Sequence, residues 1–361
     1  MSKKTIFGLL SVLLVLGLVV GCAPKAPAVE TPAEEAPAAE APAAEKPATA
    51  KKMTFAIIHL QEGNPYFAVE ENGVKEAAAE LGVDFIFKGP ATMDVASQIE
   101  LVDSLIAQKV DIIGISAIDP NALVPLGQKA MNAGIKFFSW DSPVAKEGRL
   151  LHTDAAAPEA LGRVEAQMMG KMLNYEGKVA VISAGATNEN SNLWVKWIQE
   201  ELKDPKYSKM ELVEVTYGDD DYQKSYNLAQ SLYKKYPDLK GFIAPTSVGI
   251  VAASKFIKDE GLTGKVFATG LGLPSEMKEY IKDGICLEMA LWNPIDQGYL
   301  TIYISEALVN GKLTPKAGEK FTAGKLGELE VVDIGSGNLI VYQGQPKVFD
   351  QSNIDEFAAI F

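Results

Sequence analysis

The chain has 361 residues, of which 47 are acidic and 34 basic, so its formal net charge is −13. A chain this acidic argues against nucleic acid as a partner, because phosphate backbones are bound by basic surfaces. Residues 52–361 are 310 in number, which corresponds to one large or two ordinary domains at roughly 100–200 residues each.

The N-terminus has the composition of a secretory signal. Lys3 and Lys4 precede an apolar run at residues 6–20, which is shorter than the about 20 apolar residues that span a bilayer. The run ends in Val-Val-Gly-Cys, which resembles the lipobox of bacterial lipoproteins, whose cysteine is lipidated and becomes the first residue. We expect a signal peptide over residues 1–21 and a lipid anchor on Cys22. An ordinary leader with an incidental cysteine, or an uncleaved anchor, is the alternative.

The segment that follows has the composition of a tether. Ala, Pro and Glu dominate from Ala23 to Ala50, and a proline recurs every fifth residue from Pro27. No apolar period is available for burial, and proline interrupts any continuous helix. We therefore expect residues 22–51 to be a disordered linker between the lipid anchor and a globular part.

From residue 53 onward, short apolar segments alternate with amphipathic ones. Near-continuous apolar strands between amphipathic helices predict parallel sheets that are covered by helices on both faces. In the first half, strands are expected at 53–60, 83–89, 110–117 and 135–142, with helices at 65–82, 94–109 and 119–134.

A second cycle of the same kind follows, so the sequence predicts two doubly wound α/β units in series. Its strands are expected at 178–184, 210–218, 240–245, 265–272 and 286–292, with helices at 159–173, 189–203, 222–236, 248–261 and 275–284. A long helix at 294–311 and a strand-rich tail complete the chain. Met168, Met169 and Met172 have helical spacing, for which core packing is the better interpretation.

Polar and aromatic side chains collect where these strands end, and ligands of doubly wound sheets bind beyond the carboxyl ends of the strands. The candidate binding residues are His59, Asn64, Phe67, Trp140, Asp141, Asn190, Ser191, Pro245, Ser247, Trp292, Asn293, Asp296 and Gln297. Carboxylate and amide groups hydrogen-bond to neighbouring hydroxyls, and an aromatic face covers the C–H side of a sugar ring. With no phosphate cradle, this set favours a small neutral polyol. Trp140 would be its apolar wall, and Asp141 would accept its hydroxyl protons.

Structural alternatives exist for several of these candidates. Asp141 suits a loop cap, Trp140 a core position at a strand end, and Asn190 a helix N-cap. His59 suits a satisfied polar group at a loop entrance, and Asp296 and Gln297 suit caps of the long helix. For His152, a structural role is the better interpretation.

Signatures of catalysis, metal binding and disulfide formation are missing from the sequence. It contains no C-x-x-C, H-E-x-x-H or G-x-S-x-G, and Pro274 disrupts the incomplete glycine pattern of the segment GLGLPS. The acidic triplet 219–221 has no further ligands at metal spacing, so a solvated loop is expected. We expect no cofactor, no metal and no enzymatic activity. Because Cys22 is assigned to the anchor, Cys286 should be an unpaired, apolar strand residue.

The leader, lipobox, linker and tandem α/β units together resemble lipid-anchored substrate-binding proteins of ABC importers with the type I, ribose-binding-like fold. The likeness extends from Met53 to Phe361. Several segments in one order look like the rhamnose-binding proteins and the related autoinducer-2 (LsrB-like) receptors: DPNALVP, SWDS, APTSVGIVAASK, TGLGLPSEM, WNPIDQGY and SNIDEF.

The resemblance implies two lobes joined by three crossovers and closing on one sugar. The lobes would be residues 53–156 plus 294–335 and residues 157–293 plus 336–361. The family's binding positions would fall on His59, Asp141, Asn190, Ser191, Pro245 and Ser247. Both groups of relatives carry lysine at the position of His59. Autoinducer-2 receptors carry Asp-Gln at Asn190-Ser191 and alanine at Ser247, which counts against autoinducer-2.

The resemblance therefore predicts a solute-binding lipoprotein that delivers a sugar, L-rhamnose, to the permease of an ABC importer. It would act as a monomer in the cell envelope, on the outer face of the cytoplasmic membrane or in the periplasm, with contact to the membrane only through its lipid. A sensory receptor for autoinducer-2 or a sugar is the alternative. An exported sugar enzyme is disfavoured, because no nucleophile, base and orienting group occur together.

Overall fold

The computed structural model describes residues 52–361. The signal peptide expected at 1–21, the lipidated Cys22 and the linker to residue 51 lie outside this range. Within it, no helix is both long and apolar enough to cross a membrane.

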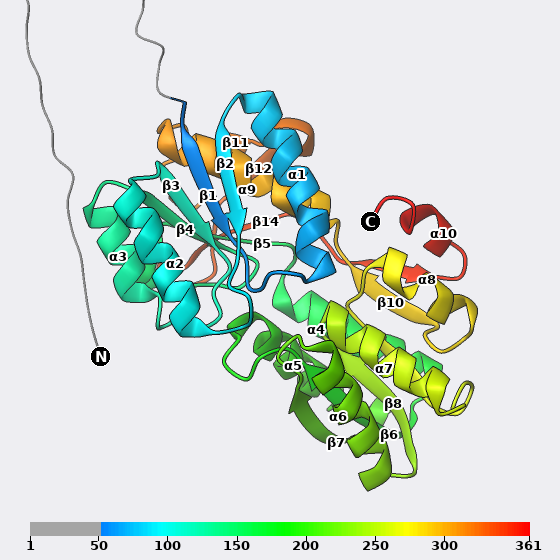
Figure 1. Ribbon diagram of the computed structural model, residues 1–361. Coiled ribbons are helices and arrows are strands. Elements are labelled where there is room, and N and C mark those ends of the chain that lie inside the picture. The colour runs from blue at the N-terminus through cyan, green and yellow to red at the C-terminus, as the bar shows by residue number, and fades with distance from the viewer. Residues whose placement is uncertain (1–51) are drawn as a thin grey trace, which may run out of the picture. The chain divides into compact units, whose positions relative to one another are not determined.

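The first lobe is built on a seven-stranded sheet with the order β13-β14-β5-β4-β3-β1-β2, in which all neighbours are parallel except β13 and β14 (Figure 1). Its strands are β1 (Thr54–Ile58), β2 (Asp84–Lys88), β3 (Ile112–Ile115), β4 (Lys136–Trp140), β5 (His152–Asp154), β13 (Val332–Asp333) and β14 (Leu339–Tyr342). Its helices are α1 (Pro65–Leu81), α2 (Val95–Gln108), α3 (Val124–Asn132), α9 (Pro294–Val309) and the 3-10 turns η1 (Lys146–Gly148) and η3 (Gly324–Leu326). A small hairpin, β11 (Lys320–Thr322) and β12 (Glu328–Glu330), packs beside them.

The strands of this sheet bury both faces, as their near-continuous apolar sequences predict. Along β1, Phe55 and Ile57 join the core cluster that includes α1 and α9, whereas Ala56 and Ile58 join the cluster of α2 and α3. Successive strand side chains point to opposite faces, so one apolar strand contributes to two cores.

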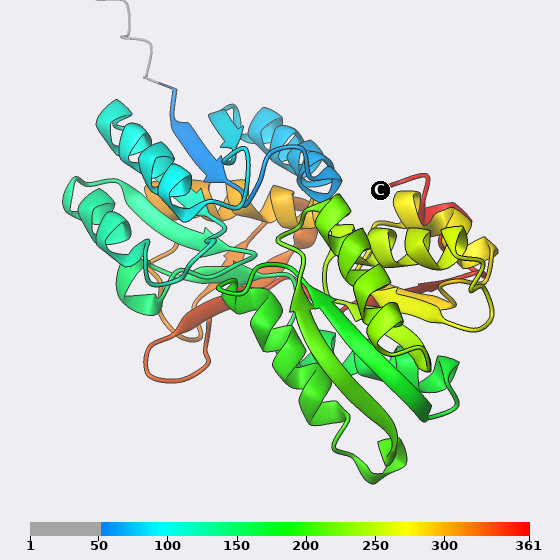
Figure 2. The same cartoon turned by 60° about the horizontal axis from the view of Figure 1, so that its bottom comes forward.

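The second lobe has a four-stranded parallel sheet, β7-β6-β8-β9, extended by β10 and β15 (Figure 2). A single bridge between Leu271 and Ala290 connects the two sheets. The strands are β6 (Glu176–Ser183), β7 (Lys209–Tyr217), β8 (Leu239–Ala244), β9 (Phe267–Gly270), β10 (Glu288–Leu291) and β15 (Lys347–Asp350). The helices are α4 (Pro158–Met172), α5 (Glu189–Glu201), α6 (Tyr222–Lys235), α7 (Ser247–Asp259), α8 (Pro274–Lys282), α10 (Ile354–Phe357) and the 3-10 turn η2 (Pro205–Tyr207).

The chain crosses between the lobes three times, so the predicted pair of α/β lobes with a three-crossover hinge is confirmed. The crossings follow β5, β10 and β14. One predicted boundary is wrong, because residues 336–342 do not belong to the second lobe. β14 pairs in parallel with β5, with Ile340 opposite His152, which places the third crossing after Tyr342.

Two core expectations are also settled. Met168 and Met169 are fully buried, in line with core packing. Cys286 is buried and free, but it lies in the turn that leads to β10, two residues before that strand begins. Its thiol donates a hydrogen bond to the Glu288 carbonyl at 3.4 Å, and this bond stabilises the turn. The prediction that Cys286 is a strand residue is therefore wrong.

Candidate functional site

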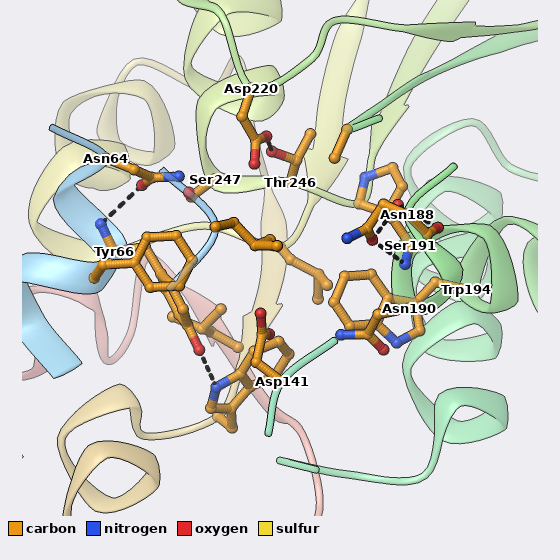
Figure 3. Close-up of a pocket in the computed structure, with 17 residues that line it drawn as sticks. Asn64, Tyr66, Asp141, Asn188, Asn190, Ser191, Trp194, Asp220, Thr246 and Ser247 are labelled. Atoms are coloured by element: carbon orange, nitrogen blue, oxygen red, sulfur yellow. Dashed lines mark hydrogen bonds between the residues drawn. The ribbon is translucent and has the colours of Figure 1, made fainter. Parts of the chain in front are cut away.

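A cavity of ≈ 60 Å³ lies between the lobes, at the carboxyl ends of the strands (Figure 3). By the measure of roughly 10–15 Å³ for one water-sized group, it has room for a small molecule. Its apolar wall consists of Leu60, Tyr66, Phe67, Ala184, Trp194, Pro245, Leu271, Leu291 and Trp292. Its polar wall consists of Asn64, Asp141, Asn188, Asn190, Ser191, Asp220, Thr246 and Ser247.

Asp141 is the buried carboxylate of the cavity, and Figure 3 shows its side chain pointing inward. It follows β4 with φ at +55°, a left-handed conformation that costs energy in a non-glycine residue and often marks a functional position. Oδ2 accepts a 2.6 Å hydrogen bond from Ser116 Oγ. Burial raises the pKa of Asp141 to about 7, against the hydrogen bond from Ser116, which lowers it. Oδ1 accepts no hydrogen bond within residues 52–361, which leaves it for a ligand hydroxyl.

The first turn of α5 supplies the opposite polar wall. Asn188 caps this helix, because its Oδ1 accepts from the backbone nitrogen of Ser191 at 2.9 Å. Its amide also donates to Ser142 Oγ at 3.0 Å, a bond that joins the two lobes. Asn190 Oδ1 and Trp194 Nε1 are buried without a partner in the described part of the chain. Two polar atoms left open beside one cavity indicate that a polar ligand completes them.

The start of α1 supplies the apolar side. Asn64 caps the helix by accepting from the backbone nitrogen of Tyr66 at 3.0 Å, and Pro65 occupies the first helical position, where proline is favoured. The Tyr66 hydroxyl accepts from Trp292 Nε1 and donates to Gln297 Oε1, each at 2.7 Å. Tyr66 therefore presents its ring to the cavity, because its hydroxyl is already paired.

Asp220 follows β7 and lines the cavity, which corrects the prediction that the whole acidic triplet is a solvated loop. Its carboxylate accepts a hydrogen bond from Thr246, which precedes α7 (Figure 3). Burial raises its pKa above the usual range for an aspartate. Asp219 is exposed, and Asp221 caps α6, so the triplet divides into three different roles.

Most of the candidates from the sequence meet at this cavity, and five do not. The eight that line it are Asn64, Phe67, Asp141, Asn190, Ser191, Pro245, Ser247 and Trp292. The five that do not are His59, Trp140, Asn293, Asp296 and Gln297.

His59 and Trp140 lie in a layer behind the cavity wall. The His59 ring stacks on Phe67 with centroids 4.8 Å apart, and burial lowers its pKa. Trp140 is fully buried and lies edge-on to Phe67, with ring centroids 6.2 Å apart. Both residues thus support Phe67, and the expectation that Trp140 itself forms the ligand wall is not met.

The remaining three candidates organise the start of α9. Asn293 caps the helix by accepting from the backbone nitrogen of Ile295 at 3.1 Å, and its amide donates to Asp296 at 2.6 Å. Gln297 holds the Tyr66 hydroxyl. The cap of α9 is thus Asn293, and the expected caps Asp296 and Gln297 instead accept side-chain hydrogen bonds from Asn293 and Tyr66.

Nine lining residues were not among the candidates: Leu60, Tyr66, Ala184, Asn188, Trp194, Asp220, Thr246, Leu271 and Leu291. Seven of them lie at or just beyond the end of a strand. Ligands of doubly wound sheets bind beyond the carboxyl ends of the strands, so position alone could have identified these seven, whatever their residue type. Tyr66 lies in the first turn of α1 and Trp194 in the second turn of α5, where a helical wheel alone does not separate a cavity-facing ring from a core-facing one. Among residues 52–361, no group of three or more His, Cys, Asp or Glu side chains is arranged to hold a metal ion.

Comparisons with known proteins agree with this architecture. A family model described as a periplasmic binding protein domain matches residues 55–313. The structure of an ABC transporter solute binding protein from Clostridium phytofermentas with bound L-rhamnose is 36% identical, covers 86% of this chain and 99% of its own, and has a TM-score of 0.83. A sugar ABC transporter protein from Actinomyces odontolyticus is 37% identical over 84% of this chain and 97% of its own, with a TM-score of 0.67.

LsrB from Clostridium saccharobutylicum, in complex with AI-2, is 22% identical over 84% of this chain and 99% of its own, with a TM-score of 0.79, which shows a shared fold. The family model spans well over half of the chain, and it agrees with the two-lobed type I architecture. The chain therefore belongs to the periplasmic binding protein domain family, as a solute-binding protein of the sugar ABC transporter type.

Proposed function

We propose that this protein binds L-rhamnose in the interlobe cavity and delivers it to the permease of an ABC importer. In this proposal the lobes close around the sugar, no covalent step occurs, and the closed form docks on the permease. The protein acts as a monomer in the cell envelope, at the outer face of the cytoplasmic membrane or in the periplasm, and is tethered through lipid on Cys22.

The observation that supports this function best is the set of open polar atoms around one small cavity. The free oxygen of Asp141, Asn190 Oδ1 and Trp194 Nε1 offer two acceptors and one donor. A sugar hydroxyl both donates and accepts, so a ring with several hydroxyls can satisfy all three. An unpaired buried polar group costs about 1–3 kcal/mol, which gives each of these bonds a role in affinity.

The apolar side of the cavity favours a sugar with an unsubstituted hydrocarbon face. Phe67, Leu271 and Leu291 line it without a polar group of their own, and the Tyr66 hydroxyl is paired elsewhere. A 6-deoxyhexose presents a methyl group and C–H bonds to such a wall, whereas a hexose would bury its 6-hydroxyl there unpaired. The relative with bound L-rhamnose is consistent with this choice.

The test is a calorimetric titration of residues 52–361, freed of ligand by unfolding and refolding, with L-rhamnose, L-fucose, D-ribose, D-allose and autoinducer-2. Binding of L-rhamnose at least about tenfold tighter than each of the others, or about 1.4 kcal/mol, is expected. Preference for a different sugar would overturn the assignment of L-rhamnose. Tight binding of autoinducer-2 alone would favour the alternative function, a sensory receptor.

A further inference from the structure

A second cavity of ≈ 350 Å³ lies between the lobes, next to the first. The first lobe contributes Arg149, His152 and Tyr342 to it, and the second lobe contributes Leu193. Asn190 lines both cavities. The two spaces therefore share a wall at the first turn of α5, and the carbonyl oxygen of the Asn190 amide has no protein partner there.

Buried polar atoms in the second cavity are also left open. His152 is 1% exposed, and its Nδ1 is paired with Ser139 Oγ at 3.0 Å, whereas its Nε2 has no partner within residues 52–361. Nε2 lies 3.9 Å from Asp154 Oδ2, which is too far for a direct hydrogen bond. A ligand hydroxyl between them can donate to one and accept from the other, whichever ring nitrogen of His152 carries the proton.

Two basic side chains, Arg149 and Lys146, and two acidic ones, Glu147 and Glu189, line this cavity, and the buried His152 and Asp154 suit a neutral ligand. The Arg149 guanidinium already donates to the Val144 carbonyl, the Leu339 carbonyl and Asn338 Oδ1, at 2.6, 3.1 and 2.6 Å, so three of its five N–H donors are used within the protein. Burial lowers the pKa of His152 well below its usual value, which keeps the ring neutral. Burial also raises the pKa of Asp154 to about 8, so that this carboxyl carries a proton at neutral pH.

The remaining walls combine polar side chains with apolar and aromatic ones. Tyr342 and Ile340 from β14 face this space together with Leu193 from α5. An aromatic ring and aliphatic side chains beside a few open hydrogen-bonding atoms are the surroundings in which a sugar ring packs its C–H face.

We propose that the second cavity is a subsite for a second sugar ring, and that the protein takes up a rhamnoside, such as a rhamnose-containing disaccharide, with Asn190 between the two rings. This inference rests on the proposed function, because the first ring occupies the cavity around Asp141. It extends that function from a monosaccharide to a glycoside.

The experiment compares L-rhamnose, neohesperidose and rutinose, two rhamnosyl-glucoses of different linkage, by calorimetry on the refolded residues 52–361. The wild-type protein is expected to bind at least one disaccharide about tenfold or more tightly than L-rhamnose. The variant Leu193→Trp fills the second cavity without touching the first. It should lose this gain and keep its affinity for L-rhamnose. Leu228→Trp on α6, a partly buried leucine outside both cavities, is the matched control and should behave as the wild type does.

Each outcome separates the two proposals. If L-rhamnose binds and neither disaccharide binds more tightly, the second subsite is refuted while the proposed function stands. If a disaccharide gains affinity but Leu193→Trp leaves the gain unchanged, the second ring lies elsewhere and the assignment is wrong. If neither L-rhamnose nor a disaccharide binds, the proposed function fails and the subsite fails with it.

Discussion

The hydroxyl of Tyr66 accepts a 2.7 Å hydrogen bond from the indole nitrogen of Trp292, which connects helix α1 of the first lobe to the second crossover of the hinge. The same hydroxyl donates to Gln297 Oε1 at 2.7 Å on α9. All three side chains are buried. The wall of the ligand cavity is thus tied to the segment about which the lobes move.

Tyr66→Phe removes the shared hydroxyl and leaves the Trp292 N–H and the Gln297 carbonyl unpaired in the interior. We expect the free energy of unfolding to fall by about 1–3 kcal/mol, the cost of unpaired buried polar groups. Urea denaturation of the ligand-free protein measures this change. Tyr303→Phe is the control, because the Tyr303 hydroxyl contacts Glu80 at the surface. Equal destabilisation by the two variants would contradict the proposed importance of the buried network.

Asp141→Asn tests the buried carboxylate of the cavity. Asparagine tolerates the left-handed backbone at φ +55°, so the fold should persist. A hydrogen bond to a charged group contributes about 1.5–3 kcal/mol, so the affinity for L-rhamnose should fall by about tenfold or more. Calorimetry measures the loss, and wild-type affinity in this variant would remove Asp141 from the site.

The affinity should also depend on pH through Asp141. Sugar hydroxyls donate best to the ionised carboxylate, and burial raises its pKa to about 7. Binding should therefore be about tenfold weaker at pH 6 than at pH 8, in proportion to the ionised fraction. Titrations across this range would show the slope in the wild-type protein and its loss in Asp141→Asn. A flat wild-type profile would show that the affinity does not depend on the ionisation of Asp141.

Ser142→Ala removes the acceptor of the bond that Asn188 makes across the cleft. That bond exists only when the lobes are close, so the variant should weaken sugar binding about fivefold, equivalent to about 1 kcal/mol, without lowering the melting temperature of the ligand-free protein. Asn188→Ala should weaken sugar binding and also lower the melting temperature of the ligand-free protein, since Asn188 also caps α5. Identical behaviour of the two variants would show that the interlobe bond has no separate role.

The burial of Glu165 on α4 should make the free energy of unfolding depend on pH. Both of its carboxyl oxygens are buried without a partner in residues 52–361, and burial raises its pKa well above the usual value. A raised pKa in the folded state stabilises the protein at low pH, and this stability is lost as pH rises toward the folded-state pKa. Glu165→Gln should therefore reduce the fall in stability of the ligand-free protein between pH 5 and pH 8.5, as measured by urea denaturation. Glu159→Gln, at an exposed position on the same helix, should leave the fall unchanged.

The fold was largely predictable because its strands are encoded by short-range patterns. Residues 55–58 are apolar at every position, which indicates a strand covered on both faces whatever its neighbours are. The boundary at residue 336 was not predictable in this way. β14 joins the first sheet through pairing of Ile340 with His152, a contact nearly 190 residues apart that leaves no local trace.

The candidate site shows the same division. Asp141 follows a strand end, so the rule for doubly wound sheets located it. Trp140 comes one residue earlier, and alternation along the strand turns its side chain into the core behind Phe67. His59 is likewise turned toward Phe67 and Phe87. Asp220 was wrongly predicted to be a solvated loop residue. Its position at the cavity depends on its hydrogen bond with Thr246, which lies in a different loop.

The alternation of strands and helices, the doubly wound units and the edge of each sheet at which a ligand binds can all be predicted from the order of the residues. These follow from periodic burial and from chain direction, which are local properties. Three features required the three-dimensional structure: which lobe contains β14, which side chains at the strand ends face the cavity, and which of them are already paired. These depend on packing between elements distant in sequence, and the free or paired state of a polar atom is fixed only when its neighbours are in place.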